Sequence, residues 1–315
     1  MHILGFDIGG TKCAVITAEY DGKNIKFLKK SKCGTDLHIT PDEMISRLIA
    51  MADEIIDEKP SAIGISCGGP LDAERGVIMG PPNLPGWDNV EIVKILEEHY
   101  GVPAHLQNDA NASAVAEWKF GAGRGSKNMI FMTFGTGLGA GLILNGKLYD
   151  GTNGNAGEVG HIRLCDTGPM GYGKCGSFEG FCSGGGIAKL GLAMAEEKAL
   201  HGEYPLYYKK GMKPDEVSAK TIAEAARLGD ETAIAVYRKS GEYLGKGLSI
   251  LIDILNPETV VIGSVFARSR DLLWESAKAE IEKEALAIAA DCCKVLPAEL
   301  GEQIGDYAAI AVAVV

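Results

Sequence analysis

One pattern occurs twice in the sequence and constrains the fold more than any other: a short apolar run reaches a polar residue and then turns on glycine and threonine. The first copy is GFDIGGT at residues 5–11, and the second is FMTFGTG at residues 131–137. A second apolar run follows each copy, which predicts two β-hairpins with glycine-rich tips. Two related α/β lobes would produce this pattern, and two unrelated glycine hairpins would produce it equally.

The rest of the chain alternates apolar runs with helical periodicity, as expected for an α/β fold. Thr40 before Pro41 predicts a helix start. We expect strands at residues 3–6, 13–18, 25–28, 62–67, 104–107, 129–134, 139–144 and 259–262. We expect helices at residues 41–56, 90–100, 110–120, 185–200, 219–228, 232–255, 270–289 and 304–315. The polar segment 201–216 is expected to be a surface insertion.

Composition and charge exclude several classes of protein. Hydrophobic residues make up 46% of the 315-residue chain, which argues against disorder, and the net charge of -11 argues against broad binding to nucleic acids or anionic membranes. The first residues lack a secretion signal, and the uncharged stretch at 128–146 contains five glycines, so we predict no membrane span. We expect a cytoplasmic protein whose eight cysteines are reduced.

The two glycine-rich loops are candidate phosphate-binding sites. Their backbone N–H groups can approach a phosphate closely, threonine hydroxyls can add donors, and an aspartate at a strand end can hold hydrated Mg²⁺. An ordinary β-turn with an exposed lysine is the alternative for the first loop. The candidate residues are Asp7, Gly9, Gly10, Thr11 and Lys12 in the first loop, and Thr133, Gly135, Thr136 and Gly137 in the second.

Asp109, in the segment 107–112 between a strand and a helix, is a candidate general base. Such a carboxylate can take the proton of a sugar hydroxyl that attacks a γ-phosphoryl group. A simple helix N-cap is the other interpretation. Glu158 and His161, in a loop with many glycines, can converge on a ligand, and Glu179 follows eighteen residues after His161. Solvated side chains, and for Glu179 an acid in the first turn of a helix, are the alternatives.

These segments occur in the order seen in the ROK family, which comprises bacterial sugar kinases, related open reading frames and repressors. The matching segments are residues 7–12, 82–87, 108–111, 133–141 and 157–161. The resemblance implies an α/β fold similar to actin, Hsp70 and hexokinase, with two ribonuclease-H-like lobes around a central cleft. We expect the lobes at residues 1–108 and 109–303, with the helix at 304–315 packing back on the first.

The resemblance also implies ATP- and Mg²⁺-dependent phosphorylation of a hexose hydroxyl, for example the 6-hydroxyl of glucose, with Asp109 as catalytic base. A homodimer is implied as well. Gly263 would border the adenosine, and Ser264 stands where the family commonly has a second glycine. The residues that would line the sugar are Gly69, Asn83, Asn108, Glu158, His161 and Glu179.

We do not expect the structural zinc that many family members bind. In those proteins the histidine is followed by a C-x-C-G-x-x-G-C cluster, and this chain lacks the C-x-C pair. His161, Cys165, Cys175 and Cys182 offer four nominal ligands, but without the spacing that makes zinc motifs specific.

Two other functions stay open at this point. ROK proteins include sugar-responsive transcriptional regulators, which carry a helix-turn-helix domain ahead of the kinase-like part. Because Asp7 already belongs to the first loop and the net charge is acidic, we do not expect that domain here. A catalytically silent sugar-binding protein is the third possibility, and the presence of Asp109 together with both loops argues against it.

Overall fold

The structure is a computed structural model that describes residues 1–314. It contains two compact units, and both combine a β-sheet with helices, as predicted. The first unit comprises Met1–Gly125, Gly141–Ala156 and residues 299–314. The second comprises Ser126–Ala140 and Gly157–Ala298.

The first unit is built on a five-stranded sheet of order β3-β2-β1-β4-β8. The first three strands are antiparallel neighbours, whereas β1, β4 and β8 run parallel to one another. The strands are β1 (His2–Ile8), β2 (Lys12–Tyr20), β3 (Ile25–Gly34), β4 (Ala62–Cys67) and β8 (Ala104–Asn108).

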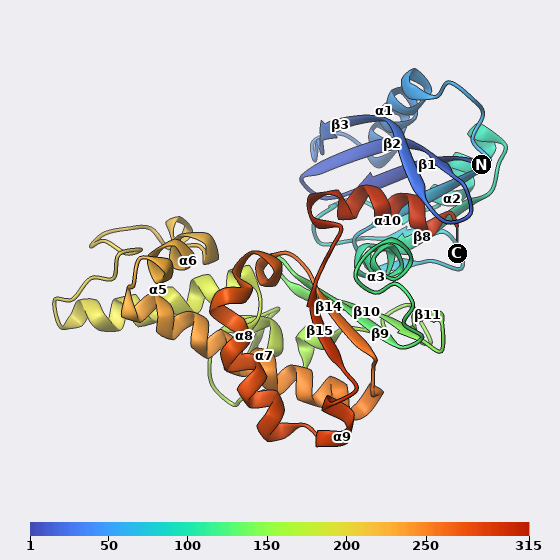
Figure 1. Ribbon diagram of the computed structural model, residues 1–315. Coiled ribbons are helices and arrows are strands. Elements are labelled where there is room, and N and C mark those ends of the chain that lie inside the picture. Colours follow the sequence, from blue (N-terminus) through green and yellow to red (C-terminus); the bar gives the residue numbers. More distant parts are fainter. Residues whose placement is uncertain (315) are drawn as a thin grey trace. The chain divides into compact units, whose positions relative to one another are not determined.

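The two faces of this sheet bury different cores. Helices α1 (Pro41–Ile55) and α2 (Ile92–Tyr100) cover one face, and α10 (Ile304–Val312) covers the other. Figure 1 shows α10, from the red end of the chain, beside the blue strands. It lies so close that a Cβ at Gly64 would be 1.9 Å from the carbonyl oxygen of Ala309, so this position requires glycine.

The second five-stranded sheet has the order β11-β10-β9-β14-β15, in which β14 is parallel to β9 and β15. Its order repeats that of the first sheet: a hairpin at one side and parallel strands at the other. This repetition favours related lobes over unrelated hairpins as the origin of the repeated pattern. The strands are β9 (Met129–Phe134), β10 (Leu138–Leu144), β11 (Lys147–Tyr149), β14 (Thr259–Ile262) and β15 (Lys294–Pro297).

Helices make up much of the second unit. They are α4 (Phe178–Phe181), α5 (Gly184–Leu200), α6 (Ala219–Arg227), α7 (Glu231–Leu255), α8 (Val265–Glu284) and α9 (Ala287–Ala290). The first unit also contains α3 (Asp109–Phe120). The short elements are β5 (Leu71–Asp72), β6 (Val77–Met79), β7 (Asp88–Val90), β12 (Met170–Gly171), β13 (Lys174–Cys175), η1 (Val159–His161), η2 (Pro214–Glu216) and η3 (Gly301–Gln303).

The helix predicted after Thr40 begins with a complete capping box. The backbone N–H of Glu43 donates to Thr40 Oγ1 at 3.3 Å, and the N–H of Thr40 donates to Glu43 Oε2 at 2.8 Å. The insertion at 201–216 is mostly exposed, as expected, but Tyr207 is buried and its hydroxyl donates to the carbonyl of Gly191 at 2.8 Å.

Several predicted boundaries were wrong. The helix expected at 270–289 runs from Val265 to Glu284, because Ala285 is extended and α9 follows as a separate helix. The helix expected at 90–100 begins at Ile92, since Val90 pairs in β7. The strand β15 was not predicted, because it begins with Lys294 and ends with Pro297, which leaves only two apolar residues as a strand signal.

The C-terminal helix α10 ends at Val312, short of the predicted end at residue 315, which lies outside the described residues. It packs against β1 and β4 of the first unit. The boundaries of the two compact units differ from the expected boundary between the lobes at residues 108 and 109. Helix α3 packs on α10 and therefore belongs to the first unit. None of the described helices is long and apolar enough to cross a membrane.

Candidate active site

The carboxyl ends of β1, β4 and β8 lie at one edge of the first sheet. In the parallel pairing Asp7 lies opposite Ser66, and Cys67 lies opposite Asn108. Because parallel strands end on the same side, Asp7, the loop after β4 and the start of α3 share this edge. Ligands of open α/β sheets bind at such edges. The structure therefore brings together the candidate residues of the first unit.

The tip of the β1–β2 hairpin is a tight turn, as its sequence predicts. The N–H of Gly9 donates to the carbonyl of Lys12 at 3.1 Å. A Cβ at Gly10 would lie 2.4 Å from the backbone oxygen of Asn83, so the close approach of these two segments requires glycine here. The side chains of Thr11 and Lys12 are exposed and accessible to a ligand.

Two asparagine side chains approach the loop that follows β4. The amide oxygen and nitrogen of Asn83 both lie 3.5 Å from the point that a Cβ atom on Gly68 would occupy. The amide nitrogen of Asn108 lies 2.9 Å from the point that a Cβ atom on Gly69 would occupy. Amide groups beside an open glycine backbone offer both donors and acceptors, which is the chemistry that sugar hydroxyls require.

Asp109 is the first residue of α3, and its side chain is exposed. The helix is capped by Asn108, whose Oδ1 accepts from the N–H of Ala110 at 2.9 Å. The interpretation of Asp109 as the N-cap is therefore wrong, because the preceding residue performs that role.

Asp7 is a largely buried carboxyl among like charges. Burial, and then the negative charges of Asp306 and Asp109, raise its pKa to about 6, while Lys30 and Lys12 act in the opposite direction. Asp306 lies in the first turn of α10 and pairs with Lys30 at 2.5 Å. Sequence reasoning missed Asp306. The only available signal was an acid at the start of a helix expected to pack back on the first lobe.

In the second unit, Glu179 is bonded to the second glycine-rich loop. Its Oε2 accepts from the N–H of Leu138 at 3.0 Å. The loop is also closed internally, since the N–H of Gly139 donates to Thr133 Oγ1 at 3.0 Å and the N–H of Gly135 donates to the carbonyl of Gly137 at 3.1 Å. Glu179 is in the first turn of α4, as its alternative interpretation proposed, and it also contacts the loop.

Glu158 precedes the short helix η1 and His161 is its last residue, and the N–H of His161 donates to the carbonyl of Glu158 at 3.2 Å. The Glu158 side chain is exposed. The rings of His161 and Tyr172 contact edge-on, with their centroids 4.8 Å apart. A Cβ at Gly160, between them, would lie 3.3 Å from the Cβ of Glu179. The structure therefore places these three candidates in one neighbourhood of the second unit.

A pocket of about 730 Å³ lies in the second unit beside the same loop. Gly135 and Thr136 line it together with Gly184 and Gly185 at the start of α5. The N–H of Gly184 donates to the carbonyl of Gly135 at 2.7 Å. A helix N-terminus beside a glycine turn is suited to a phosphate, and the volume is that of a cofactor site.

The remaining walls of this pocket come from α6, α7 and α8. These helices contribute basic side chains to the pocket. No sequence motif marks those side chains, so sequence reasoning missed them. The polar and aromatic residues of these walls are Ser218, Lys220, Glu224, Arg227, Tyr237, Ser264, Arg268 and Ser269.

Gly263 lies just outside the pocket lining, and its N–H donates to the carbonyl of Met132 at 3.0 Å. The next residue, Ser264, does line the pocket and has a φ of 55°, a value that favours glycine. Its Oγ accepts from the Arg268 guanidinium at 3.2 Å. The serine that departs from the family pattern therefore holds an arginine at the pocket wall.

The four nominal zinc ligands do not form a metal site. The thiol of Cys182 is fully buried and donates to the carbonyl of Ser240 at 3.4 Å, and burial raises its pKa well above the ordinary value. Within residues 1–314, no three His, Cys, Asp or Glu side chains are placed to hold a metal ion. These residues do not fit zinc, and we assign zinc no role.

A sequence profile of the ROK family matches residues 3–314. The chain belongs to the ROK family. It is 33% identical over 276 residues to the glucokinase of Thermotoga maritima, which covers 87% of this chain and 85% of that enzyme. It is also 27% identical to the xylose repressor of Bacillus subtilis, over 96% of this chain and 74% of the repressor. Its relatives therefore include both enzymes and regulators.

Solved structures of ROK proteins share the fold. The ROK family glucokinase from Streptomyces griseus, in complex with glucose and AMPPNP, superposes with a TM-score of 0.77 at 30% identity and 99% coverage of both chains. The predicted α/β fold of the actin-like type is confirmed by this comparison.

Proposed function

We propose that this ROK protein is an ATP-dependent sugar kinase that phosphorylates the 6-hydroxyl of glucose or of a closely related hexose. The observation that carries the proposal is the placement of Asp109 with Asn108, Asn83 and the loop at residues 68–69, at the carboxyl edge of the first sheet. The similarity to the Thermotoga maritima glucokinase and to the Streptomyces griseus enzyme with glucose and AMPPNP supports it.

In this proposal Asp109 acts as general base. Its carboxylate accepts the proton of the sugar hydroxyl as that oxygen forms a bond to the γ-phosphorus, and the bond from phosphorus to the ADP oxygen breaks. The amide groups of Asn83 and Asn108 hold neighbouring sugar hydroxyls and so orient the attacking oxygen. Most of the rate enhancement then comes from positioning and from charge stabilisation.

We assign Glu158, His161 and Glu179 to sugar binding as well. Glu179 Oε2 is held by the N–H of Leu138, so Oε1 is the atom that we assign to a sugar hydroxyl. A carboxylate fixed in this way recognises a hydroxyl by its direction, which discriminates between epimers.

We assign the pocket of the second unit to ATP. The phosphates would lie at Gly135, Thr136 and the start of α5, and the nucleoside would lie against α6, α7 and α8. Residues 9–12 supply further phosphate donors.

Asp7 fits Mg²⁺, which proteins usually bind through one or two carboxylates plus substrate phosphates. Its neighbours Asp306 and Asp109 disfavour its own negative charge, and a divalent cation would relieve this repulsion. When bound, Mg²⁺ supplies neutralisation of the phosphate charge.

A coupled ADP-release assay across hexoses and N-acetylhexosamines tests the proposed function. We expect sugar-dependent ADP release that is fastest with glucose or a related hexose, is lost on addition of a chelator, and returns with excess Mg²⁺. If no sugar stimulates ADP release, the kinase proposal is wrong.

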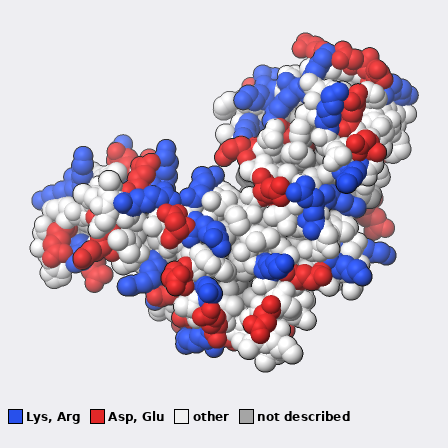
Figure 2. Space-filling view, in the orientation of Figure 1, with Lys and Arg blue, Asp and Glu red and all other residues white. Residues whose placement is uncertain are grey.

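A sugar-responsive transcriptional regulator is the second candidate, because the Bacillus subtilis xylose repressor matches 96% of this chain. On the face shown in Figure 2, basic and acidic side chains are interspersed, whereas DNA-binding surfaces cluster their basic residues. Sugar-sensitive DNA binding in a gel-shift assay, without ADP release, would favour the regulator. Sugar binding with neither activity would indicate a catalytically silent protein.

We further propose a homodimer, as the family resemblance implies. Light scattering at micromolar protein concentration tests this assembly, and a monomer mass would contradict it.

A further inference from the structure

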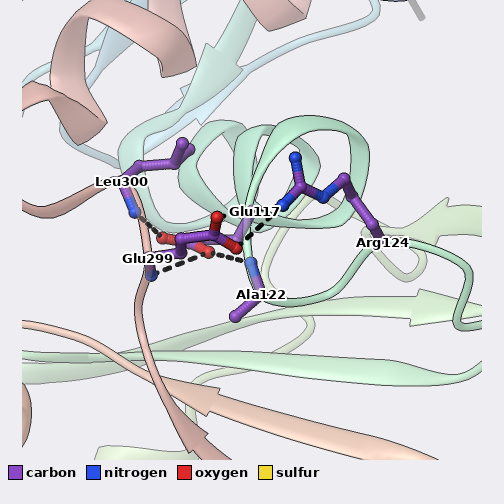
Figure 3. A network of polar contacts seen from close by, with 5 residues as sticks. All are labelled: Glu117, Ala122, Arg124, Glu299 and Leu300. Atoms are coloured by element: carbon purple, nitrogen blue, oxygen red, sulfur yellow. Dashed lines mark hydrogen bonds and ion pairs between the residues drawn. The ribbon is translucent and has the colours of Figure 1, made fainter.

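Glu117 is a fully buried carboxylate near the end of α3 that accepts hydrogen bonds from three backbone amides. Its Oε2 accepts from the N–H of Ala122 at 2.8 Å and from that of Glu299 at 3.3 Å. Its Oε1 accepts from the N–H of Leu300 at 2.9 Å. Figure 3 shows these bonds converging on the carboxylate from two separate segments. Burying such a group is unfavourable unless its oxygens are satisfied, so the position depends on these amides.

The hydrogen bonds of Glu117 connect the C-terminal end of α3 with the segment that precedes α10. Ala122 belongs to the turn that ends α3, whereas Glu299 and Leu300 precede η3 and α10. At the exposed margin, Arg124 pairs with Glu299 at 2.9 Å. The carboxylate of one helix is therefore bonded to the segment that leads into the other.

Many of the residues that α3 and α10 bury have small side chains, since seven of the fifteen buried residues of the two helices are alanines. Small side chains allow close approach but form shallow ridges, which resist sliding less than large ones. A buried polar group whose partners are available in only one register can specify that register. The buried alanines are Ala110, Ala112, Ala114 and Ala116 in α3 and Ala308, Ala309 and Ala311 in α10.

The two helices carry acids at their N-terminal ends. Asp109 lies about two turns before Glu117, or about 12 Å along the helix axis, and Asp306 is in the first turn of α10. We propose that Glu117 is a positioning residue that fixes the axial position of α3 against the segment at 299–300 and thereby places Asp109. The proposal rests on the proposed function in one respect, since it takes Asp109 to be the base.

The variant Glu117→Gln tests this role, because it keeps the size of the side chain but leaves one acceptor oxygen and turns an N–H₂ group toward a backbone N–H. We expect faster hydrogen exchange at the amides of residues 122, 299 and 300, and at Ala110 near the start of α3. We expect kcat to fall about tenfold to a hundredfold, with the KM values for ATP and sugar within about threefold, since a small misplacement of a catalytic group has effects of this size.

Two control variants separate position from stability. Arg124→Ala removes the exposed ion pair with Glu299 but keeps the three amide bonds, so it should turn over normally. Leu96→Ala opens the core on the other side of the sheet without touching α3. A kcat loss in Glu117→Gln that is no larger than that of Leu96→Ala, at an equal loss of Tm, would overturn the proposal.

Hydrogen exchange can be measured without enzyme turnover, so it tests the positioning role of Glu117 independently of the proposed kinase activity. If wild-type protein releases no ADP with any sugar, the proposed function fails, and Glu117 is judged on exchange alone. Unchanged protection at residue 300 and at Ala110 in Glu117→Gln would then refute the positioning role.

Discussion

Replacing Asp109 by asparagine tests the proposed chemistry with little disturbance of the fold. The side chain is exposed at the first position of α3, and the cap bond from Ala110 to Asn108 does not involve it. Asparagine has nearly the same size and shape. The substitution therefore removes the proton acceptor and leaves the helix start in place.

The expected effects on rate and on stability differ in size. Removing one charge from the first turn of a helix costs about 0.3–1 kcal/mol. Removing the repulsion between Asp109 and Asp7 acts in the opposite direction. The free energy of unfolding should therefore change by less than about 1 kcal/mol. A general base contributes about 10²- to 10⁴-fold in rate, or about 3–5 kcal/mol of barrier, so we expect kcat to fall by that factor.

The assay is coupled ADP release for kcat and KM, with urea unfolding for stability and calorimetry for sugar binding. Asp42→Asn is the matched control, because Asp42 is also an exposed acid in the first turn of a helix, α1. It should lose similar stability and retain full turnover. If Asp109→Asn keeps kcat within about threefold of wild type, Asp109 is not the base and the mechanism is wrong.

Three further predictions concern the surroundings of the site. The pKa of Asp7 rises from 3.8 to about 6 on folding, so this carboxyl destabilises the fold increasingly as the pH rises through that interval. Asp7→Asn should therefore be more stable than wild type by up to about 3 kcal/mol at pH 7 but not at pH 4. Urea titrations without Mg²⁺ that give the same difference in the free energy of unfolding at both pH values would contradict this. Glu179→Gln keeps an acceptor oxygen for the N–H of Leu138 but loses the charge. It should therefore raise the KM for sugar at least about tenfold and leave the KM for ATP within about twofold, because a hydrogen bond to a charged group becomes a neutral one. Equal changes in both KM values would argue against the assignment to sugar. Ser264→Gly should stabilise the protein by about 1 kcal/mol in thermal unfolding, because φ is 55° there, and a lower Tm would mean that the bond to Arg268 outweighs the strain.

Local sequence predicted the elements whose signals are local. Thr40, Pro41 and Glu43 define a helix start through contacts within four residues, and the structure has that cap. The glycine hairpins were also predictable, since turn and strand signals lie within a few residues of each other. The start of α8 was missed because Val265 follows a residue with positive φ, an irregular entry that lacks a cap signal.

The sequence by itself determined the family and the α/β class, because the order of its glycine motifs is preserved along the chain whatever the packing. Only the tertiary structure revealed Asp306 beside Asp7, the amides of residues 299–300 on Glu117, and the cations Lys220 and Arg268 at one pocket. Each of these joins segments far apart in the chain. Their proximity comes from how helices pack on sheets, and such long-range contacts leave no periodic or local pattern in the sequence.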